Sequence, residues 1–468
     1  MCLEKGMLLK MTNEIKKYKF NINSFFEKCK KHKSIIILLF LICLFCYYLI
    51  WTISQPYNTC PDESMKWDIC KYIYENNKLP VGEEESIRNE IWGISYAFQP
   101  ILTYIIGAGF MKIASIFTTD PFALVVSARL VSTLSMVISI YFVIKIADKL
   151  FKDKGIYKYL FIAMIAFQPL TAFLASYINN DSTAVLATTM IIYLWILGLE
   201  SNWKTKHCIL LGIAIGFCAL TYYNAYGYIL CSIILCLISV NSNKMKAKDI
   251  WKKVLIVAII AFAVAGWWFI RNAVLYDGDF LGIEAQNKCG DKYALEKYKP
   301  SVRLTVQKRG ENLFDMLFRE RWLLTTALSF VGIFGYHSIV MSQKIYYCYM
   351  IIWLIGGIGC LIDFKELFKF KKEEKNKYFL NYIFVLSIII PIILSIIYSY
   401  TSDFQAQGRY IMGIIIPFTY FIVNGIQTIL DKIIKSKDIR NIIIMLIITL
   451  IIAISFRALF AYVIPAYK

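Results

Sequence analysis

Residues 34–53 read SIIILLFLICLFCYYLIWTI, a run without one charged side chain. An α-helix needs roughly 20 such residues to cross a hydrocarbon layer of about 30 Å, so this run predicts a membrane-spanning helix. A lysine-rich stretch, residues 16–33, precedes the run, and no small-residue cleavage site follows it. We therefore expect a retained first span and not a cleaved signal peptide.

Similar apolar runs recur along the chain, and 58% of its 468 residues are hydrophobic. The runs are continuous and do not alternate with polar residues, which favours helices over a β-barrel. The sequence predicts an all-α polytopic integral membrane protein with about eleven transmembrane helices, and up to thirteen if two further stretches cross. The expected spans are residues 34–53, 122–145, 157–177, 182–199, 207–222, 225–239, 252–271, 345–363, 378–400, 409–427 and 440–460.

Basic joints between the runs set the expected orientation, because Lys and Arg collect in cytoplasmic loops. They place the N-terminal segment, residues 1–33, in the cytoplasm and the C-terminus outside. Two apolar stretches, residues 98–117 and 322–342, fit this parity only as helices that lie along the outer leaflet without crossing. Residues 34–468 then form one transmembrane domain. Its two long outer loops are the acidic segment 54–120 and residues 276–344.

The net charge of +19 comes from lysines in the short joints and forms no continuous basic face, so we expect no nucleic-acid partner. Most of the 13 Cys lie inside apolar runs, where Cys behaves as a small hydrophobe and specifies no disulfide framework. With three His in the whole chain, a His-based metal site is not expected.

Two acidic motifs fall at expected outer ends of spans: Thr59-Cys60-Pro61-Asp62-Glu63 and Asn179-Asn180-Asp181-Ser182. Both also suit helix starts, with Pro61 at a first helical position and Asn180 or Asp181 as an N-cap. If a cavity between helices brings the motifs together, their paired acids suit a general base or ligation of a divalent metal.

Three arginines near expected span ends are candidate binding residues. Arg409 begins a span at its outer N-terminus, where the helix dipole disfavours a cation, so we expect an anionic partner, a protein carboxylate or a phosphate. Snorkelling to lipid headgroups is the structural alternative. Arg129 lies about two turns into a span, where pairing with an acid such as Asp120 would be structural. Arg271 ends a span at the outer face.

Several motifs, in order along nearly the whole chain, carry a resemblance to a known family. They are Pro61-Asp62-Glu63, Phe98-Gln99-Pro100-Ile101-Leu102-Thr103-Tyr104, Asn179-Asn180-Asp181, Trp267-Trp268-Phe269-Ile270-Arg271-Asn272, Leu275-Tyr276-Asp277-Gly278-Asp279, Ser329-Phe330-Val331-Gly332-Ile333-Phe334-Gly335-Tyr336 and Gln407-Gly408-Arg409-Tyr410. With them the chain resembles polytopic glycosyltransferases of the GT-C fold, which include protein O-mannosyltransferases and aminoarabinose transferases. It resembles most the bacterial family called domain of unknown function 2142.

The resemblance implies a GT-C-like bundle with outer juxtamembrane helices and a catalytic acid in the first outer loop. It implies transfer of a sugar from a polyprenyl-phosphate carrier to a glycan, lipid or protein acceptor at the outer face of the plasma membrane, with inversion. In this interpretation Asp62 or Glu63 is the base, Asp181 assists, and Arg409 neutralises the departing phosphate. The remaining expected substrate-binding residues are Gln407, Tyr410, Arg271, Asn272, Lys66 and Gln99.

The sequence leaves two questions open. A divalent cation, Mg²⁺ or Mn²⁺, is one option, with Asp62 and Asp181 as its ligands. The alternatives to a transferase are a flippase or transporter of lipid-linked saccharides and a polymerase of envelope polysaccharide. Convergence of Asp62, Asp181 and Arg409 around one pocket would favour the enzyme.

Overall fold

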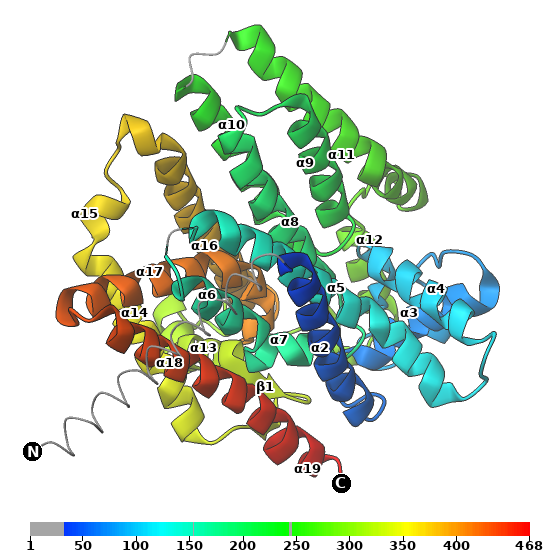
Figure 1. Ribbon diagram of the computed structural model, residues 1–468. Coiled ribbons are helices and arrows are strands. Elements are labelled where there is room, and N and C mark those ends of the chain that lie inside the picture. Colours follow the sequence, from blue (N-terminus) through cyan, green and yellow to red (C-terminus); the bar gives the residue numbers. More distant parts are fainter. Residues whose placement is uncertain (1–31, 153, 243–245) are drawn as a thin grey trace, which may run out of the picture. The chain divides into compact units, whose positions relative to one another are not determined.

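We analysed a computed structural model of the chain, which describes residues 32–152, 154–242 and 246–468 (Figure 1). The chain divides into two parts, residues 1–47 and 48–468. The described residues of the first part are almost all in the N-terminal portion of helix α2, Lys33–Ser54. Nearly all of the expected cytoplasmic segment, residues 1–33, lies outside the described residues.

The structure is helical, as predicted, with one two-stranded hairpin. In the described part of the chain, eight helical segments are long and apolar enough to cross a membrane, and they coincide with eight of the eleven expected spans. They are α2 (Lys33–Ser54), α5 (Pro121–Leu150), α8 (Asn180–Glu200), α11 (Ala247–Leu275), α14 (Gln343–Ile362), the segment Lys372–Thr401 with α16 (Lys375–Thr401), the segment Gly408–Ile433 with η7 (Gly408–Ile414) and α17 (Ile415–Ile433), and the segment Lys437–Ala466 with α18 (Lys437–Arg457), η8 (Ala458–Val463) and α19 (Ile464–Ala466).

The other three expected spans form helices shorter than these eight segments. Residues 157–177 divide into α6 (Tyr157–Ala166) and α7 (Pro169–Leu174). The break falls where Gln168 is extended and Pro169, which has no N–H, begins the next helix. The other two are α9 (Thr205–Ala219) and α10 (Gly227–Ser242), with 15 and 16 residues. Length and apolarity alone therefore identify about eight spans, fewer than the eleven expected.

The two stretches expected not to cross also form short helices. Residues 98–117 contain α4 (Leu102–Ala114), which has 13 residues, and residues 322–342 begin with α13 (Trp322–Gly332), which has 11. At about 1.5 Å per residue, both are shorter than a hydrocarbon layer of about 30 Å. After α13 the chain forms an antiparallel hairpin, β1 (Ile333–Phe334) and β2 (Ile339–Val340), which pairs Ile333 with Val340.

Most of the remaining elements belong to the two long loops. They are α3 (Glu63–Asn76), η1 (Glu85–Ile87), η2 (Tyr96–Phe98), η3 (Tyr223–Ala225), α12 (Ile283–Tyr293), η4 (Glu296–Tyr298), the π-helix η5 (Asp315–Arg319), α15 (Phe364–Leu367) and η6 (Lys372–Glu374).

Close helix contacts hold residues 48–468 together. Helix α14 packs on α17 at a glycine contact, where a Cβ on Gly359 would lie 1.9 Å from the carbonyl oxygen of Gly425. Small residues allow such close approach between membrane helices. A second cluster joins α3, α4, α5 and α11, with Tyr104 and Trp268 fully buried in it. This cluster fixes α3, and with it the first long loop, against the bundle.

Candidate functional site

The chain before α3 places Asp62 in an uncommon backbone conformation. Asp62 is the N-cap of α3 with a φ of 58°, in the left-handed region that Asp and Asn tolerate better than other non-glycine residues. The sequence had suggested Pro61 at the first helical position, and this was wrong, because Pro61 precedes the cap. The Asp62 carboxylate makes no capping hydrogen bond. Its Oδ2 instead accepts a hydrogen bond of 2.9 Å from Nη2 of Arg409.

Asp181 reaches the same arginine from the first turn of α8. The predicted cap, Asn180 or Asp181, was wrong: Asn179 caps the helix, and its side chain accepts from the Ser182 N–H at 2.8 Å. Asp181 is thereby free of capping. Its carboxylate is buried, lies 3.6 Å from Nη1 of Arg409, and accepts no hydrogen bond from the described residues. An acid in this state is available to a ligand.

Arg409 joins the two acids from a 3-10 turn that leads into α17. Its Nε donates to Oε1 of Gln407 at 2.7 Å, and its Nη2 donates to the Tyr410 hydroxyl at 2.8 Å. Gly408 permits this position, because a Cβ there would lie 2.3 Å from the backbone of Phe330 on α13. The prediction of an anionic partner for Arg409 is confirmed, since the arginine contacts two carboxylates.

Lys66 adds a second cation to the acidic pair. It lies one turn after Asp62 on α3, with Nζ 3.9 Å from Asp62 Oδ2, and is only 1% exposed. The rings of Tyr96 and Tyr177 lie below its ammonium group, with centroids 5.3 Å and 5.9 Å away. Burial lowers the pKa of Lys66, against the attraction of Asp62. Burial opposes ionisation of Asp62, but Arg409 and Lys66 outweigh it and lower the pKa of that carboxyl.

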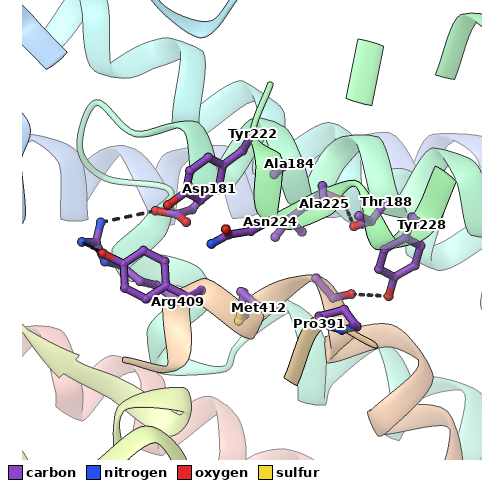
Figure 2. Close-up of a pocket in the computed structure, with 13 residues that line it drawn as sticks. Asp181, Ala184, Thr188, Tyr222, Asn224, Ala225, Tyr228, Pro391, Arg409 and Met412 are labelled. Atoms are coloured by element: carbon purple, nitrogen blue, oxygen red, sulfur yellow. Dashed lines mark hydrogen bonds and ion pairs between the residues drawn. The ribbon is translucent and has the colours of Figure 1, made fainter. Parts of the chain in front are cut away.

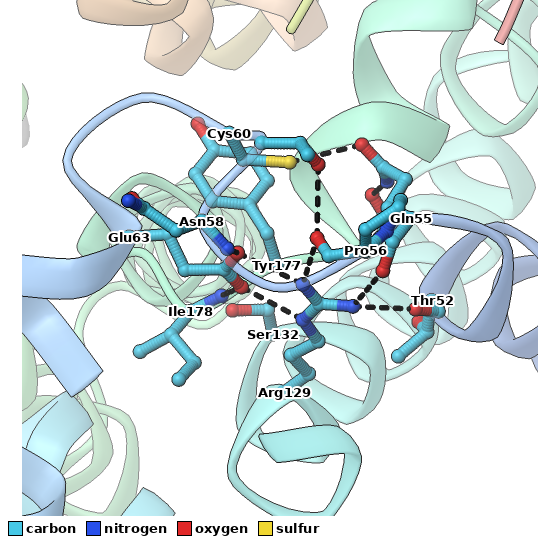
Figure 3. Close-up of polar contacts among 12 residues, drawn as sticks. Thr52, Gln55, Pro56, Asn58, Cys60, Glu63, Arg129, Ser132, Tyr177 and Ile178 are labelled. Atoms are coloured by element: carbon cyan, nitrogen blue, oxygen red, sulfur yellow. Dashed lines mark hydrogen bonds and ion pairs between the residues drawn. The ribbon is translucent and has the colours of Figure 1, made fainter. Parts of the chain in front are cut away.

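Glu63, the neighbour of Asp62, points the other way into a buried ion pair (Figure 3). Both of its oxygens accept from Arg129, at 2.7 and 2.8 Å, and both side chains are 0% exposed. The remaining Arg129 hydrogens go to the carbonyls of Thr52, Gln55 and Pro56. Asp120, the suggested partner of Arg129, instead caps α5 by accepting from the Ala123 N–H at 2.7 Å.

Two pockets meet at Arg409. The first has Asp181 and Arg409 at one end, with Tyr222 and Asn224 beside Asp181 (Figure 2). Its other lining residues are Tyr410 and a mainly apolar set: Ala184, Val185, Thr188, Ala225, Tyr228, Pro391, Met412 and Gly413. The second is lined by Pro61, Leu170, Phe173, Ser329, Ile333, His337, Gln407 and Arg409. Arg409 therefore lines both pockets.

Arg271 and Asn272 bind the long loops and make no contact with Arg409 or Asp62 in the described part of the chain. Arg271 donates to the Pro80 carbonyl at 2.5 Å and lies over the Trp268 ring. Asn272 is buried and donates to the Phe280 carbonyl at 3.4 Å. These contacts hold residues 80 and 280 of the two long loops against the end of α11. The Gln99 Oε1 atom is buried and accepts no hydrogen bond from the described residues.

The geometry does not fit a divalent cation between Asp62 and Asp181, the option that the sequence had left open. The guanidinium group of Arg409 lies between the two carboxylates, within 3.6 Å of both. Within the described residues, no three His, Cys, Asp or Glu side chains are grouped to hold a metal ion. The positive charge at these acids is supplied by Arg409 and Lys66.

The sequence analysis missed the residues that enclose the acids. The expected site residues did not include Tyr96, Tyr177, Tyr222 and Asn224. Tyr222-Tyr223-Asn224 separates two apolar runs at the same expected membrane face as the acidic motifs. His337, which lines the second pocket together with Arg409, was not among the expected site residues either. Its position in a glycine-containing turn, Gly335-Tyr336-His337, was the available signal.

Known structures match the fold. The oligosaccharyltransferase of Archaeoglobus fulgidus in the apo form matches with a TM-score of 0.51 and 13% identity, over 87% of this chain and 52% of that one. The same archaeal enzyme, AglB, in complex with an inhibitory peptide and a dolichol-phosphate, matches with a TM-score of 0.49, 14% identity, and 91% and 56% coverage. ArnT from Cupriavidus metallidurans bound to undecaprenyl phosphate matches with a TM-score of 0.41 and 12% identity, over 84% of this chain and 77% of that one.

This chain thus spans about half the length of the archaeal enzyme, and the match shows a GT-C-like fold. No curated protein sequence matches the chain. A family model described as "Predicted membrane protein (DUF2142)" matches residues 63–418. That range begins at Glu63, directly after Asp62, and holds Asp181, the β1–β2 hairpin and Arg409. The chain belongs to the DUF2142 family of membrane proteins, as its motifs had indicated.

Proposed function

We propose that this protein is a membrane glycosyltransferase that moves a sugar from a polyprenyl-phosphate carrier to a glycan, lipid or protein acceptor. The reaction takes place at the outer face of the plasma membrane, with the N-terminus in the cytoplasm. The chain crosses about eleven times if the α6–α7 pair, α9 and α10 cross together with the eight long segments. The GT-C-like fold supports this class of enzyme.

One observation carries the proposal. Arg409 bridges Asp62 and Asp181 at the first pocket, and these three residues come from distant parts of the sequence. Transfer from a phosphate carrier needs a carboxylate to accept a proton and a cation to stabilise the departing phosphate. Both groups lie within hydrogen-bonding distance of each other here, at 2.9 Å.

In the proposed reaction, Asp62 accepts the proton of the acceptor hydroxyl as its oxygen attacks the anomeric carbon. The new carbon–oxygen bond forms opposite the bond to phosphate, whose electron pair leaves with the polyprenyl phosphate, so the configuration inverts. Arg409 and Lys66 lower the pKa of Asp62, which keeps it ionised before substrate binds. When Arg409 turns toward the donor phosphate, Asp62 loses its largest attraction and becomes a stronger base.

The remaining candidates have supporting roles in this proposal. Asp181 and Asn224 bind sugar hydroxyl groups in the first pocket. Gln407 and Tyr410 orient Arg409 through their hydrogen bonds. The other residues expected to bind substrate, Arg271, Asn272 and Gln99, would act at the rim formed by the two long loops, and Glu63 has a structural role in its pair with Arg129.

The test is transfer of radiolabelled sugar from a panel of polyprenyl-phosphate sugars in proteoliposomes. We expect transfer or donor hydrolysis by the wild type and a loss of roughly 10²-fold or more in Asp62→Asn and Arg409→Ala. Asp68→Asn is the matched control, because Asp68 is a half-buried acid on the same helix, α3, outside the Arg409 cluster.

Two outcomes would contradict the proposal. No turnover with any donor, combined with movement of lipid-linked sugar between leaflets, would identify a flippase. Equal losses in Asp68→Asn and Asp62→Asn would show that the effect comes from α3 as a whole and not from the proposed base.

A further inference from the structure

The second pocket differs from the first in charge. None of the residues that line it is acidic, and its polar groups are Arg409, Gln407, His337 and Ser329. The first pocket instead contains the Asp181 carboxylate. A phosphate would be repelled by Asp181 but attracted on the other side of the same guanidinium group. The second pocket is therefore the better anion site of the two.

The remaining walls of the second pocket are apolar. Leu170 and Phe173 come from α7, and Ile333 comes from β1. A ligand that fills this pocket should therefore have an anionic end beside Arg409 and a hydrocarbon chain against these side chains. A prenyl phosphate has both features in one molecule.

The β1–β2 hairpin holds His337 at this pocket. His337 has a φ of 61° in the four-residue turn between the strands, a conformation that His adopts more readily than most residues. The preceding residue anchors the turn, because the Tyr336 hydroxyl donates to Oδ1 of Asn58 at 2.6 Å. Phe334 packs edge-on against Trp51 and at a tilt against Phe173, with centroids 5.4 Å away in both pairs. The His337 ring makes no hydrogen bond with any described residue that would compete with a ligand.

We propose that His337 is a further phosphate-binding residue, which holds the phosphate of a prenyl phosphate in the second pocket together with Arg409 and Gln407. This inference rests on the proposed function and assigns the donor's phosphate end to one side of Arg409. The sugar then extends past the guanidinium group into the first pocket, toward Asp181. The two pockets that share Arg409 become the two halves of one donor site.

Protonation of His337 fits the charge change in the reaction. The donor is a phosphodiester with one negative charge, whereas the released prenyl phosphate is a monoester with a second pKa near 6. The electron pair of the broken carbon–oxygen bond therefore adds negative charge to the phosphate. An imidazolium that took its proton from solvent on phosphate binding would donate a charge-assisted hydrogen bond to that oxygen and keep the proton.

The surroundings set the direction of this effect. Burial, with Arg409 second, lowers the pKa of His337, so the ring is neutral before phosphate binds. The negative charge of a bound phosphate favours the imidazolium and therefore raises the pKa of His337. The titratable and charged groups that face the hairpin are Arg409 from η7 and four residues from the loop before α3 and its first turn: Tyr57, Cys60, Asp62 and Glu63. Tyr346 of α14, Tyr462 of η8 and the C-terminal Tyr467 complete the set.

The experiment measures binding of farnesyl phosphate to the purified full-length protein between pH 8 and pH 6, without turnover. Inorganic phosphate and farnesol separate the two ends of the probe. His337→Asn keeps a residue that tolerates a positive φ, and His207→Asn on α9 is the matched control. We expect His337→Asn to weaken farnesyl phosphate about tenfold at pH 6 and less at pH 8, with His207→Asn unchanged. Farnesol binding should not change.

Calorimetry of the wild type in buffers of different ionisation enthalpy provides a test that needs no variant. We expect uptake of a proton per farnesyl phosphate beyond that of the ligand itself. Equal affinities of His337→Asn and wild type at every pH, with no proton uptake, would overturn the inference even if sugar transfer is active. Equal affinity for inorganic and farnesyl phosphate would overturn its lipid part. His337-dependent binding without any transfer would instead refute the proposed function.

Discussion

The adjacent acids Asp62 and Glu63 should respond in opposite ways to loss of charge. Glu63→Gln replaces one carboxylate oxygen of a bidentate pair whose two side chains are 0% exposed. It leaves the Arg129 cation buried without an anionic partner, with only neutral acceptors: the remaining amide oxygen and the carbonyls of Thr52, Gln55 and Pro56. Removal of one member of a buried pair typically destabilises a protein by about 3–5 kcal/mol.

The structure places the expected loss toward the upper end of this range. Glu63 also accepts from the backbone N–H groups of Asn58 and Ile178, at 3.1 and 3.4 Å, so the pair joins the first long loop to the start of α8. Asp62→Asn should change stability little in comparison. Its carboxylate is 32% exposed, Asn suits a φ of 58° well, and Arg409 keeps Asp181 as a partner.

The assay is thermal unfolding of both variants in detergent micelles, combined with sugar transfer at a temperature at which both are folded. We expect a lower midpoint for Glu63→Gln with transfer retained, and a normal midpoint for Asp62→Asn with transfer lost. The double variant Glu63→Gln/Arg129→Gln should recover part of the lost stability, because no buried charge is left unpaired. A wild-type midpoint for Glu63→Gln would refute the structural role of this pair.

Three further changes have equally definite expectations. Gly359→Ala should destabilise the protein by about 1–3 kcal/mol, because its Cβ would lie 1.9 Å from Gly425, whereas Gly357→Ala, with nothing within 4 Å, should leave the unfolding midpoint unchanged. Arg409→Lys should lower transfer at least about tenfold without unfolding the protein, since an ammonium group cannot reach two carboxylates and a phosphate in the same geometry. Burial raises the pKa of Asp68 to about 6, so its ionisation costs stability as the pH rises through 6. Asp68→Asn should therefore raise the midpoint at pH 7.5, and the gain should vanish below about pH 4, where the acid is protonated in both folded and unfolded chains.

Apolar length predicted most of the fold, and its failures have a local cause. Eight expected spans are long helices because each run has enough apolar residues to cross. Residues 157–177 also form a long apolar run, yet Pro169 divides it. A hydropathy count includes proline among tolerated residues and does not register the break. The stretches that contain the short helices α4 and α13 were expected not to cross only because of the lysine-rich joints. A crossing there would place later joints on the wrong side of the membrane.

The candidate site was predictable in part, because charge at a helix end requires an explanation. Arg409 at the positive end of a helix indicated an anionic partner, and two carboxylates contact it. The different surroundings of Asp62 and Glu63 could not be predicted, since the left-handed backbone at Asp62 decides which carboxylate faces which arginine. That conformation depends on contacts between segments more than 60 residues apart, such as the Glu63–Arg129 pair.

The same backbone turn connects stability with the proposed chemistry. Because Glu63 is fixed by Arg129, the backbone of Asp62 has little freedom. The Asp62 carboxylate is held toward Arg409 without a capping hydrogen bond. A base held in this way can exchange partners, since loss of the Asp62–Arg409 contact leaves both the helix and the buried pair intact. The buried ion pair therefore provides the rigidity, and the Asp62–Arg409 pair, in which Asp62 is partly exposed, provides the contact that a phosphate can displace.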